Sequence, residues 1–202
     1  DRPLLVYTGT FGKVNGVSYM VDLAKELLVR GSDVRILLVG AGAERGIVKQ
    51  AAEAAGVYQV NLFIEDPLPK KDIPALLSAA TMASALFIDL PEMRPNSANK
   101  FFDALASGTP VLLNYGGWMH DLVSKHECGL AMWQQSIKLV AEQLDKQIHD
   151  QAWLDKAGSA ARQLAEEFFD RDLLANQLIS VLEAAVEGKP ELAQSIAPGI
   201  YD

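Results

Sequence analysis

Short apolar runs alternate with longer amphipathic stretches along most of the chain, which is the pattern of βα units. Six of the apolar runs are predicted to be strands, at residues 4–8, 34–39, 60–64, 82–88, 111–114 and 129–132. Strands that are buried on both faces are apolar throughout, as these runs are, so the sheet is expected to be parallel and covered by helices on each face. The pattern therefore predicts an α/β fold, a doubly wound parallel six-stranded sheet of the Rossmann-like kind, followed by C-terminal helices.

Helices are predicted between the strands and after the last of them. Asp72 is expected to cap a short helix with Pro74 in its first turn, where the missing N–H costs nothing. After residue 135 the pattern is purely helical, with breaks near Asp150 and Asp170. The amphipathic stretches between the strands span residues 17–29, 43–55, 100–107 and 119–126.

Three parts of the chain differ in pattern. We expect a Rossmann-like domain over residues 1–135, C-terminal helices packing on it over 136–187, and an extended tail over 188–202. The first residue is Asp1 rather than a methionine, which suggests a cut site. The sequence is therefore expected to be a piece of a longer protein.

The charge balance argues against a nucleic-acid-binding module. With 18 Lys and Arg against 26 Asp and Glu, the formal net charge is −8, whereas binding to a phosphate backbone needs a local excess of cations. The single cysteine, Cys128, excludes a disulfide within the chain, and with three scattered histidines no metal site is predicted. No apolar run approaches the roughly 18 residues that a membrane-spanning helix needs. These features predict a cytoplasmic protein.

Two loops carry the predicted ligand site. In an open doubly wound sheet, ligands bind where the strand order reverses, and for the expected order 3-2-1-4-5-6 that point lies between strands 1 and 4. The loop at residues 9–16 holds three glycines before a helix, and the loop at 89–98 also runs into a helix start. Glycines let the backbone approach a ligand, and the unpaired N–H groups of a helix start favour phosphate. Lys13 and Lys100 would add positive charge, and the alternative is that the glycines only make a tight turn.

The stretch from residue 95 to residue 111 carries the most information. Asn96 or Ser97 is expected to cap the helix, and Asp103 lies one helical turn beyond Asn99, so these last two share a face. A carboxylate there can accept hydrogen bonds from both hydroxyls of a ribose while the helix N-terminus holds phosphates. The alternative for Asp103 is a solvated acid on a helix.

A second glycine run, GAGAERG at residues 40–46, is similar to a dinucleotide-binding fingerprint. Its third glycine stands one position too late for GxGxxG, and the run follows the second strand rather than the first. Glu65, at the end of the next strand, would be available to bind a ribose. An NAD-binding dehydrogenase domain therefore stays open as an alternative.

Five stretches carry a family resemblance: LLVYTGTFGKVNG, LLVGAGAE, PLPKKDIPALLSAA, FFDALASGTPVLLNYGGW and ARQLAEEFFDRDLLANQLISVLEA. Together they resemble the C-terminal domain of retaining glycosyltransferases of the GT-B fold, the glycosyltransferase group 1 family. The tract DALASGTPV in particular matches the family's EAMACGTPV. The resemblance covers nearly the whole chain.

This resemblance implies the donor-binding half of a transferase that moves a sugar from a nucleotide-sugar, with a UDP-sugar favoured, and retains its configuration. The acceptor, a surface polysaccharide or a lipid-linked molecule, would bind an N-terminal domain that is absent from this chain. Any peripheral contact with the inner face of a membrane would belong to that absent half. No metal or cofactor is implied, and no catalytic residue is assigned. The candidate donor-binding residues are Gly9, Thr10, Phe11, Gly12 and Lys13 at the diphosphate, Ser97, Ala98, Asn99 and Lys100 at the phosphates and sugar, Asp103 at the ribose, and Pro67 and Leu68 at the base.

Three positions depart from the family pattern. Pro95 stands where the family has the first of two acids, and only Glu92 in the same loop offers a substitute. Thr10 and Asn15 stand where the family has a basic pair, so the backbone and nearby lysines would have to hold the phosphates. A catalytically inactive nucleotide-sugar-binding or interaction module is therefore a further alternative. The run NYGGW resembles a subgroup that transfers amino or deoxy sugars.

Overall fold

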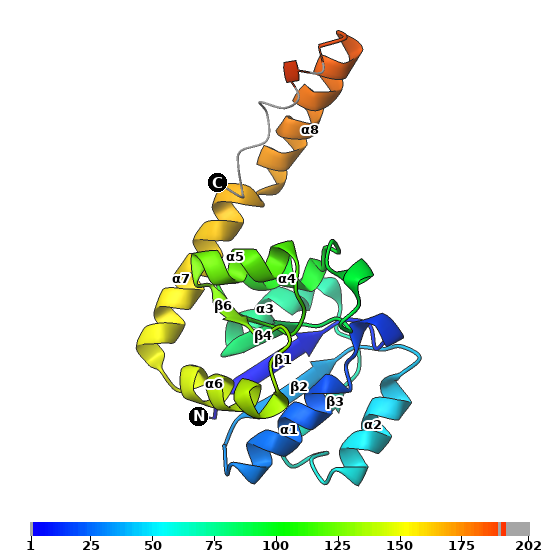
Figure 1. Cartoon of the computed structure of the whole chain (residues 1–202), viewed down its shortest axis with the longest axis vertical. Coiled ribbons are helices and arrows are strands. Elements are labelled where there is room, and N and C mark those ends of the chain that lie inside the picture. The colour runs from blue at the N-terminus through cyan, green and yellow to red at the C-terminus, as the bar shows by residue number, and fades with distance from the viewer. Residues whose placement is uncertain (1, 190, 193–202) are drawn as a thin grey trace.

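A six-stranded sheet forms the centre of the computed structural model, which describes residues 2–189, 191 and 192. Every neighbouring pair of strands is parallel, in the order β3-β2-β1-β4-β5-β6 (Figure 1). The predicted fold class and strand order are confirmed, and the order reverses between β1 and β4. The strands are β1 (Leu4–Thr8), β2 (Arg35–Val39), β3 (Leu62–Glu65), β4 (Met82–Ala85), β5 (Val111–Leu113) and β6 (Gly129–Ala131).

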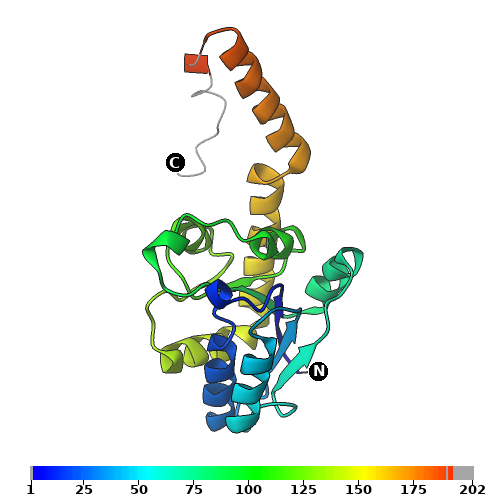
Figure 2. The same ribbon diagram turned by 90° about the vertical axis from the view of Figure 1, so that its right-hand side faces the viewer.

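Helices cover both faces of the sheet (Figures 1 and 2). Alternate residues of a strand point to opposite faces: Leu112 packs in one hydrophobic cluster, while Val111 and Leu113 pack in the other. One layer consists of α1 (Tyr19–Val29), α2 (Arg45–Ala54) and α6 (Ile137–Ile148). The other consists of α3 (Ile73–Ala79), α4 (Asn99–Ala106), α5 (Trp118–His126) and α7 (Gln151–Phe168).

The two predicted breaks among the C-terminal helices are helix caps. The carboxylate of Asp150 accepts a hydrogen bond from the backbone N–H of Trp153 at 3.0 Å and begins α7. The carboxylate of Asp170 accepts from the N–H groups of Asp172 and Leu173 and begins α8 (Arg171–Val186). Each cap satisfies N–H groups that the start of a helix leaves unpaired, so both predicted breaks are confirmed.

The last helix leaves the body of the domain. α6 packs on α1 and α7 packs on α4, whereas α8 extends away from the sheet (Figures 1 and 2). Leu174, Leu178 and Leu182, spaced one turn apart on α8, are 44%, 59% and 56% exposed. α8 therefore presents apolar side chains to solvent. Of the expected tail, residues 190 and 193–202 lie outside the described residues.

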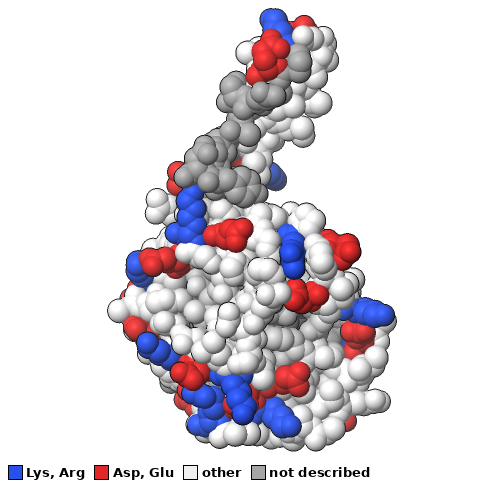
Figure 3. Space-filling view, viewed as in Figure 1, with Lys and Arg blue, Asp and Glu red and all other residues white. Residues whose placement is uncertain are grey.

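The charged side chains of the surface and the apolar character of the helices are two further features of the structure. On the face that Figure 3 shows, lysines and arginines are interspersed with acids. Within the described part of the chain, no helix combines the length and the apolar character that crossing a bilayer requires.

The strand predicted over residues 82–88 is too long, because its last residues bond to loops instead of strands. The backbone N–H of Phe87 donates to the side chain of Asn114 at 3.0 Å. The N–H of Ile88 donates to the carbonyl oxygen of Val14, also at 3.0 Å. These bonds tie the segment after β4 to the loop after β1.

The strand predicted over residues 60–64 begins two residues late in the structure. Gln59 has a φ of 58° and turns the chain, which leaves Val60 exposed instead of in the sheet. An apolar residue in a turn is therefore mistaken for the start of a strand.

Candidate functional site

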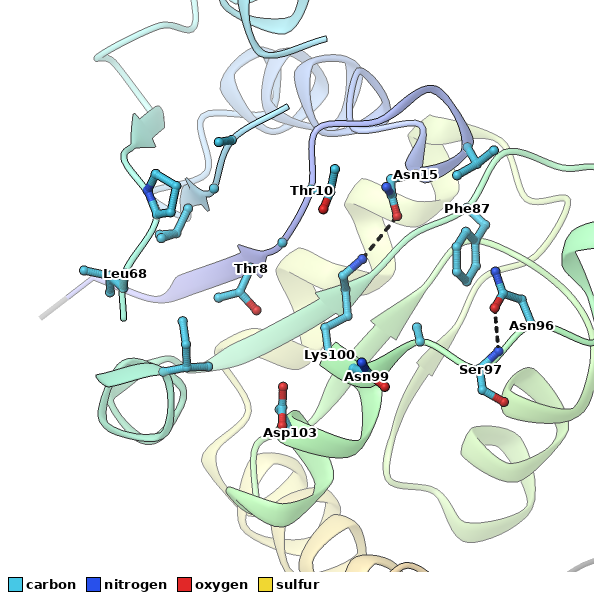
Figure 4. Close-up of a pocket in the computed structure, with 18 residues that line it drawn as sticks. Thr8, Thr10, Asn15, Leu68, Phe87, Asn96, Ser97, Asn99, Lys100 and Asp103 are labelled. Atoms are coloured by element: carbon cyan, nitrogen blue, oxygen red, sulfur yellow. Dashed lines mark hydrogen bonds between the residues drawn. The ribbon is translucent and has the colours of Figure 1, made fainter. Parts of the chain in front are cut away.

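A cavity of about 690 Å³ opens at the carboxyl ends of β1 to β4, where the strand order reverses (Figure 4). The loops after these strands and the first turn of α4 form its walls. A doubly wound sheet binds ligands at this place, and the sequence predicts the site there. Nine of the twelve candidate residues line the cavity: Gly9, Thr10, Pro67, Leu68, Ser97, Ala98, Asn99, Lys100 and Asp103.

Three candidates from the first loop, Phe11, Gly12 and Lys13, are absent from the lining. The Phe11 ring is fully buried in the core, edge-on to Tyr7 with the ring centroids 6.1 Å apart. Gly12 precedes a 3-10 turn, Lys13–Asn15, on which Lys13 is exposed. The first loop therefore faces the cavity through Gly9 and Thr10 and, after the turn, through Val14 and Asn15.

The glycines at positions 40 and 42 pack two loops together. A Cβ at Gly40 would overlap the carbonyl oxygen of Gly9, and a Cβ at Gly42 would overlap that of Phe11. The N–H of Gly9 also donates to the carbonyl oxygen of Val39 at 2.9 Å. The close approach of two backbones thus explains two of the three glycines in the run that is similar to a dinucleotide fingerprint.

Lys100 reaches from the first turn of α4 to the loop after β1 (Figure 4). Its Nζ lies 3.3 Å from Oδ1 of Asn15, 3.4 Å from the hydroxyl oxygen of Tyr7 and 4.8 Å from the centre of the Tyr7 ring. The ring of Phe87 is 5.9 Å away. These neighbours take the ammonium out of water, and this burial lowers the pKa of Lys100 to about 8.

Two members of this wall, Asn15 and Phe87, are missing from the candidates chosen from the sequence. Phe87 belongs to an apolar run and is predicted as part of a strand, so its place at the cavity follows only from the early end of β4. Thr8 and Val39 also line the cavity. They are the last residues of β1 and β2, a position that does signal the site.

The first turn of α4 opens on the cavity without a side-chain cap. Ala98 occupies the N-cap position, and no side chain there accepts from the first N–H groups. The predicted cap by Asn96 or Ser97 is wrong, because the side chain of Asn96 accepts instead from the backbone N–H of Ser97 at 2.8 Å. The uncapped turn leaves N–H groups and the positive end of the helix dipole to an anion.

Asp103 lies one turn beyond Asn99 and on the same side of α4 as Lys100 (Figure 4). Partial burial raises the pKa of its carboxyl group, and the charge of Lys70 acts in the opposite direction. Glu92 is exposed on a separate 3-10 turn and does not line the cavity. Among the described lining residues, Asp103 is therefore the only acid and Lys100 the only base. No three His, Cys, Asp or Glu side chains in the described ranges are grouped to hold a metal ion.

An aromatic cluster supports the wall that contains Asn96. The indole N–H of Trp118 donates to the carbonyl oxygen of Asn96 at 3.1 Å. The Trp118 ring packs with Phe102 and Phe169, with centroids 6.1 Å and 6.3 Å away. Phe169 stands between the end of α7 and the capping residue of α8. One cluster thus joins the α7–α8 junction to the wall of the cavity.

The fold is a Rossmann-like domain, and its cavity lies at the switch point of the sheet, where the uncapped first turn of α4 faces it. The chain belongs to the glycosyl transferases group 1 family, whose model matches residues 1–164. The family predicted from the sequence is confirmed.

Curated relatives are longer than this chain. It is 25% identical over 171 residues to a D-inositol 3-phosphate glycosyltransferase of Corynebacterium aurimucosum, a match that covers 82% of the chain and 39% of that protein. It is 23% identical over 174 residues to the MMP alpha-(1->4)-mannosyltransferase of Mycolicibacterium hassiacum, covering 86% of the chain and 41% of that protein. The chain thus spans less than half the length of these relatives.

Solved structures share the fold. Anabaena HepE in complex with UDP-glucose matches with a TM-score of 0.76 at 18% identity, over 91% of this chain and 49% of that one. The sucrose-phosphate synthase of Thermosynechococcus elongatus matches with a TM-score of 0.77 at 22% identity, over 92% and 46%.

Proposed function

We propose that this chain is the donor-binding half of a glycosyltransferase and that it holds a nucleotide-sugar, with a UDP-sugar favoured. One observation carries the proposal: a single cavity brings together Asp103, the uncapped first turn of α4 and the loop after β1. The family membership supports a transferase. The structural neighbour HepE was solved with UDP-glucose, which supports a nucleotide-sugar as the ligand.

The chemistry of the cavity suits the three parts of such a donor. Val39, Pro67 and Leu68 form an apolar side that suits the flat face of a base. The carboxylate of Asp103 can accept hydrogen bonds from both hydroxyls of a ribose. The N–H groups at the start of α4 suit the diphosphate, because they carry the positive end of the helix dipole.

In the transfer step, this half of the enzyme orients the donor and stabilises the charge that develops on it. As the sugar leaves, negative charge grows on the diphosphate, and preorganised N–H dipoles and a cation stabilise it. We place no general base in this chain, and neither a metal ion nor a cofactor enters the proposal. The sugar keeps its configuration, and the acceptor, a surface polysaccharide or a lipid-linked molecule, binds the N-terminal half.

The exposed side chains of α8 support the existence of that second half. Leu174, Leu178 and Leu182 lie one turn apart and in water. The relatives' matched regions are 39% and 41% of their length, so they carry more chain than is present here. We assign the contact surface of the N-terminal domain to this apolar face of α8. Any peripheral contact with a membrane belongs to that domain.

A catalytically inactive nucleotide-sugar-binding module is the second candidate. It is favoured by Pro95 in the loop after β4 and by the position of Glu92 outside the cavity, which leave Asp103 as the only acid among the described lining residues. A transferase assay of the whole protein separates the two candidates. Turnover of a UDP-sugar contradicts the inactive module, and donor binding without turnover over a panel of acceptors supports it.

Calorimetric titration of this chain with UDP, GDP and NAD tests the donor site. We expect UDP to bind, and to bind at least about tenfold more weakly to Asp103→Ala, because a charge-assisted hydrogen bond is lost. Asp121→Ala is the matched control, since that carboxylate is 75% exposed on α5 and outside the cavity. Binding of NAD in preference to UDP and GDP, or equal UDP affinity in the wild type and Asp103→Ala, would contradict the proposal.

A further inference from the structure

The cavity offers a single positive side chain to a ligand that carries more than one negative charge. Among the described lining residues, Lys100 is the sole base. The first loop contributes the neutral side chains of Thr10 and Asn15, and Lys13 is exposed and outside the lining. A diphosphate in this cavity therefore has one side-chain cation within it to pair with.

We propose that Lys100 is the single cation that holds the donor's diphosphate, and that Tyr7 and Asn15 are positioning residues that fix its ammonium beside the loop after β1. This inference rests on the proposed function, because it assigns the charge partner of the same donor. The positive charge comes from α4, on the wall opposite the glycine loop.

The contacts of the ammonium leave room for a ligand. An ammonium has three N–H donors, and Asn15 and Tyr7 accept two of them at 3.3 Å and 3.4 Å. The Tyr7 hydroxyl itself donates to the carbonyl oxygen of Thr10 at 2.8 Å, so its oxygen faces Lys100 as an acceptor. The third N–H of Lys100 remains for a phosphate oxygen.

Gly9 allows the lysine to lie against the loop. A Cβ at position 9 would stand 3.0 Å from Cε and 3.4 Å from Nζ of Lys100. The backbone of the loop and the ammonium therefore reach the same part of the cavity. A larger residue at position 9 would push the lysine away from it.

Proton uptake gives this role a signature that a passive lysine lacks. With a pKa of about 8, Lys100 is about half protonated at pH 8. A neighbouring anion favours the charged form, so UDP binding at that pH takes up as much as about half a proton. Uridine has no phosphate, so its binding is expected to take up no proton.

The other titratable groups near Lys100 are Tyr7, which is buried and contacts its ammonium, and Asp103, which lines the cavity. Burial raises the pKa of both side chains, and Lys70 opposes the shift at Asp103. Tyr7→Phe and Asp103→Ala measure what each contributes to the uptake. We assign to Lys100 the part of the proton uptake that is lost in Lys100→Met and retained in Asp103→Ala.

The test is a calorimetric titration of the full 202-residue chain at pH 8 with UDP and with uridine. Two buffers of different ionisation enthalpy give the number of protons taken up. We expect Lys100→Met to bind UDP about ten- to a hundredfold more weakly, to bind uridine as the wild type does, and to lose the proton uptake. Lys49→Met is the matched control, because Lys49 also lies over a tyrosine ring, with Nζ 5.2 Å from the centre of Tyr58, but outside the cavity.

Conservative variants separate positioning from folding. Lys100→Arg keeps the charge and is expected to keep most of the preference for UDP over uridine. Asn15→Asp places an acid beside the ammonium and keeps Lys100 fully protonated at pH 8, so it is expected to abolish the proton uptake while uridine binding persists. A residue with a structural role only would not change the uptake.

Several results would overturn the inference. Equal UDP affinity in Lys100→Met and the wild type removes Lys100 from the site, and loss of affinity in Lys13→Met alone transfers the role to Lys13. If wild-type protein binds UDP no more tightly than uridine, the cavity has no diphosphate site, although the nucleoside part of the proposed function survives. If neither UDP nor uridine binds, the proposed function itself is wrong.

Discussion

Gly40 lies against Gly9 so closely that a Cβ at position 40 would overlap the carbonyl oxygen of Gly9. The loop after β2 therefore supports the loop after β1 backbone to backbone. We expect Gly40→Ala to lower the free energy of unfolding by about 3 kcal/mol, because no side-chain rotation relieves an overlap with a backbone oxygen. Urea unfolding measures the difference.

Gly46 provides the control for that substitution. It belongs to the same glycine run, but it lies in α2 and a Cβ there meets no atom within 4 Å. Gly46→Ala is expected to raise the free energy of unfolding by about 0.5 to 1 kcal/mol, since alanine restricts the unfolded chain. Equal effects of the two substitutions would show that the contact between the loops is unimportant.

The fold could be predicted because its signals are local. Continuous apolar runs mark strands that are buried on both faces, and the aspartates at 150 and 170 mark helix starts through their own carboxylates. The errors arise where contacts distant in sequence decide the structure. The side chain of Asn114 takes the N–H of Phe87 out of the sheet, and no pattern around residue 87 contains that information.

The candidate site could be predicted in position but only in part in composition. The ends of β1 and β4 indicate where the cavity lies, and nine of the twelve candidates line it. Lys13 does not line the cavity, because it is exposed on a 3-10 turn of three residues, Lys13–Asn15, which brings Asn15 to the cavity instead. The role of Gly40 could not be predicted either, because the residue that it contacts, Gly9, is 31 positions earlier in the chain.

We expect substitution of the two capping aspartates by alanine to affect stability differently. Asp150→Ala is expected to lower the free energy of unfolding of the whole domain by about 1 kcal/mol, because α7 packs on α4. Asp170→Ala removes a cap of similar strength from α8, which extends away from the body. It is expected to speed amide hydrogen exchange within α8 and to leave the urea midpoint unchanged. A fall in the midpoint for Asp170→Ala as large as that for Asp150→Ala would contradict this.

His149, at the end of α6, predicts a pH dependence of stability. Its Nε2 lies 2.8 Å from Oδ1 of Asp33, and its Nδ1 lies 2.6 Å from the carbonyl oxygen of Asp145. The carbonyl of Asp145 and the carboxylate of Asp33 raise the pKa of His149, which in turn lowers the pKa of Asp33. The stabilisation from a raised histidine pKa is complete below about pH 6.5 and is lost as the pH rises through the raised value.

The measurement compares the wild type with His149→Gln in urea at several pH values. The difference in unfolding free energy is expected to be less than about 1 kcal/mol, since the pair is exposed, and to be largest near pH 5 to 6. It falls at alkaline pH as His149 loses its proton, and at acid pH as Asp33 gains one. A difference that grows as the pH rises would contradict the assignment.

Leu178→Glu tests whether the N-terminal domain contacts α8. Because it is 59% exposed, Leu178→Glu is expected to change the stability of this chain by less than about 0.5 kcal/mol. In the whole protein the same change buries a charge against the proposed N-terminal contact, and it is expected to cost more than about 1 kcal/mol. Leu164→Glu, at a buried position of α7, should destabilise both forms. Equal, small effects of Leu178→Glu in the two forms would place the contact elsewhere.

The junction at Phe169 gives α8 the geometry of a lever. The 16 residues of α8 extend about 24 Å from this junction, so a small rotation at the junction becomes a large displacement at the far end of α8. At the junction, Phe169 packs on Trp118, whose indole N–H donates to the carbonyl oxygen of Asn96. The base of α8 and the wall of the cavity therefore share one aromatic cluster.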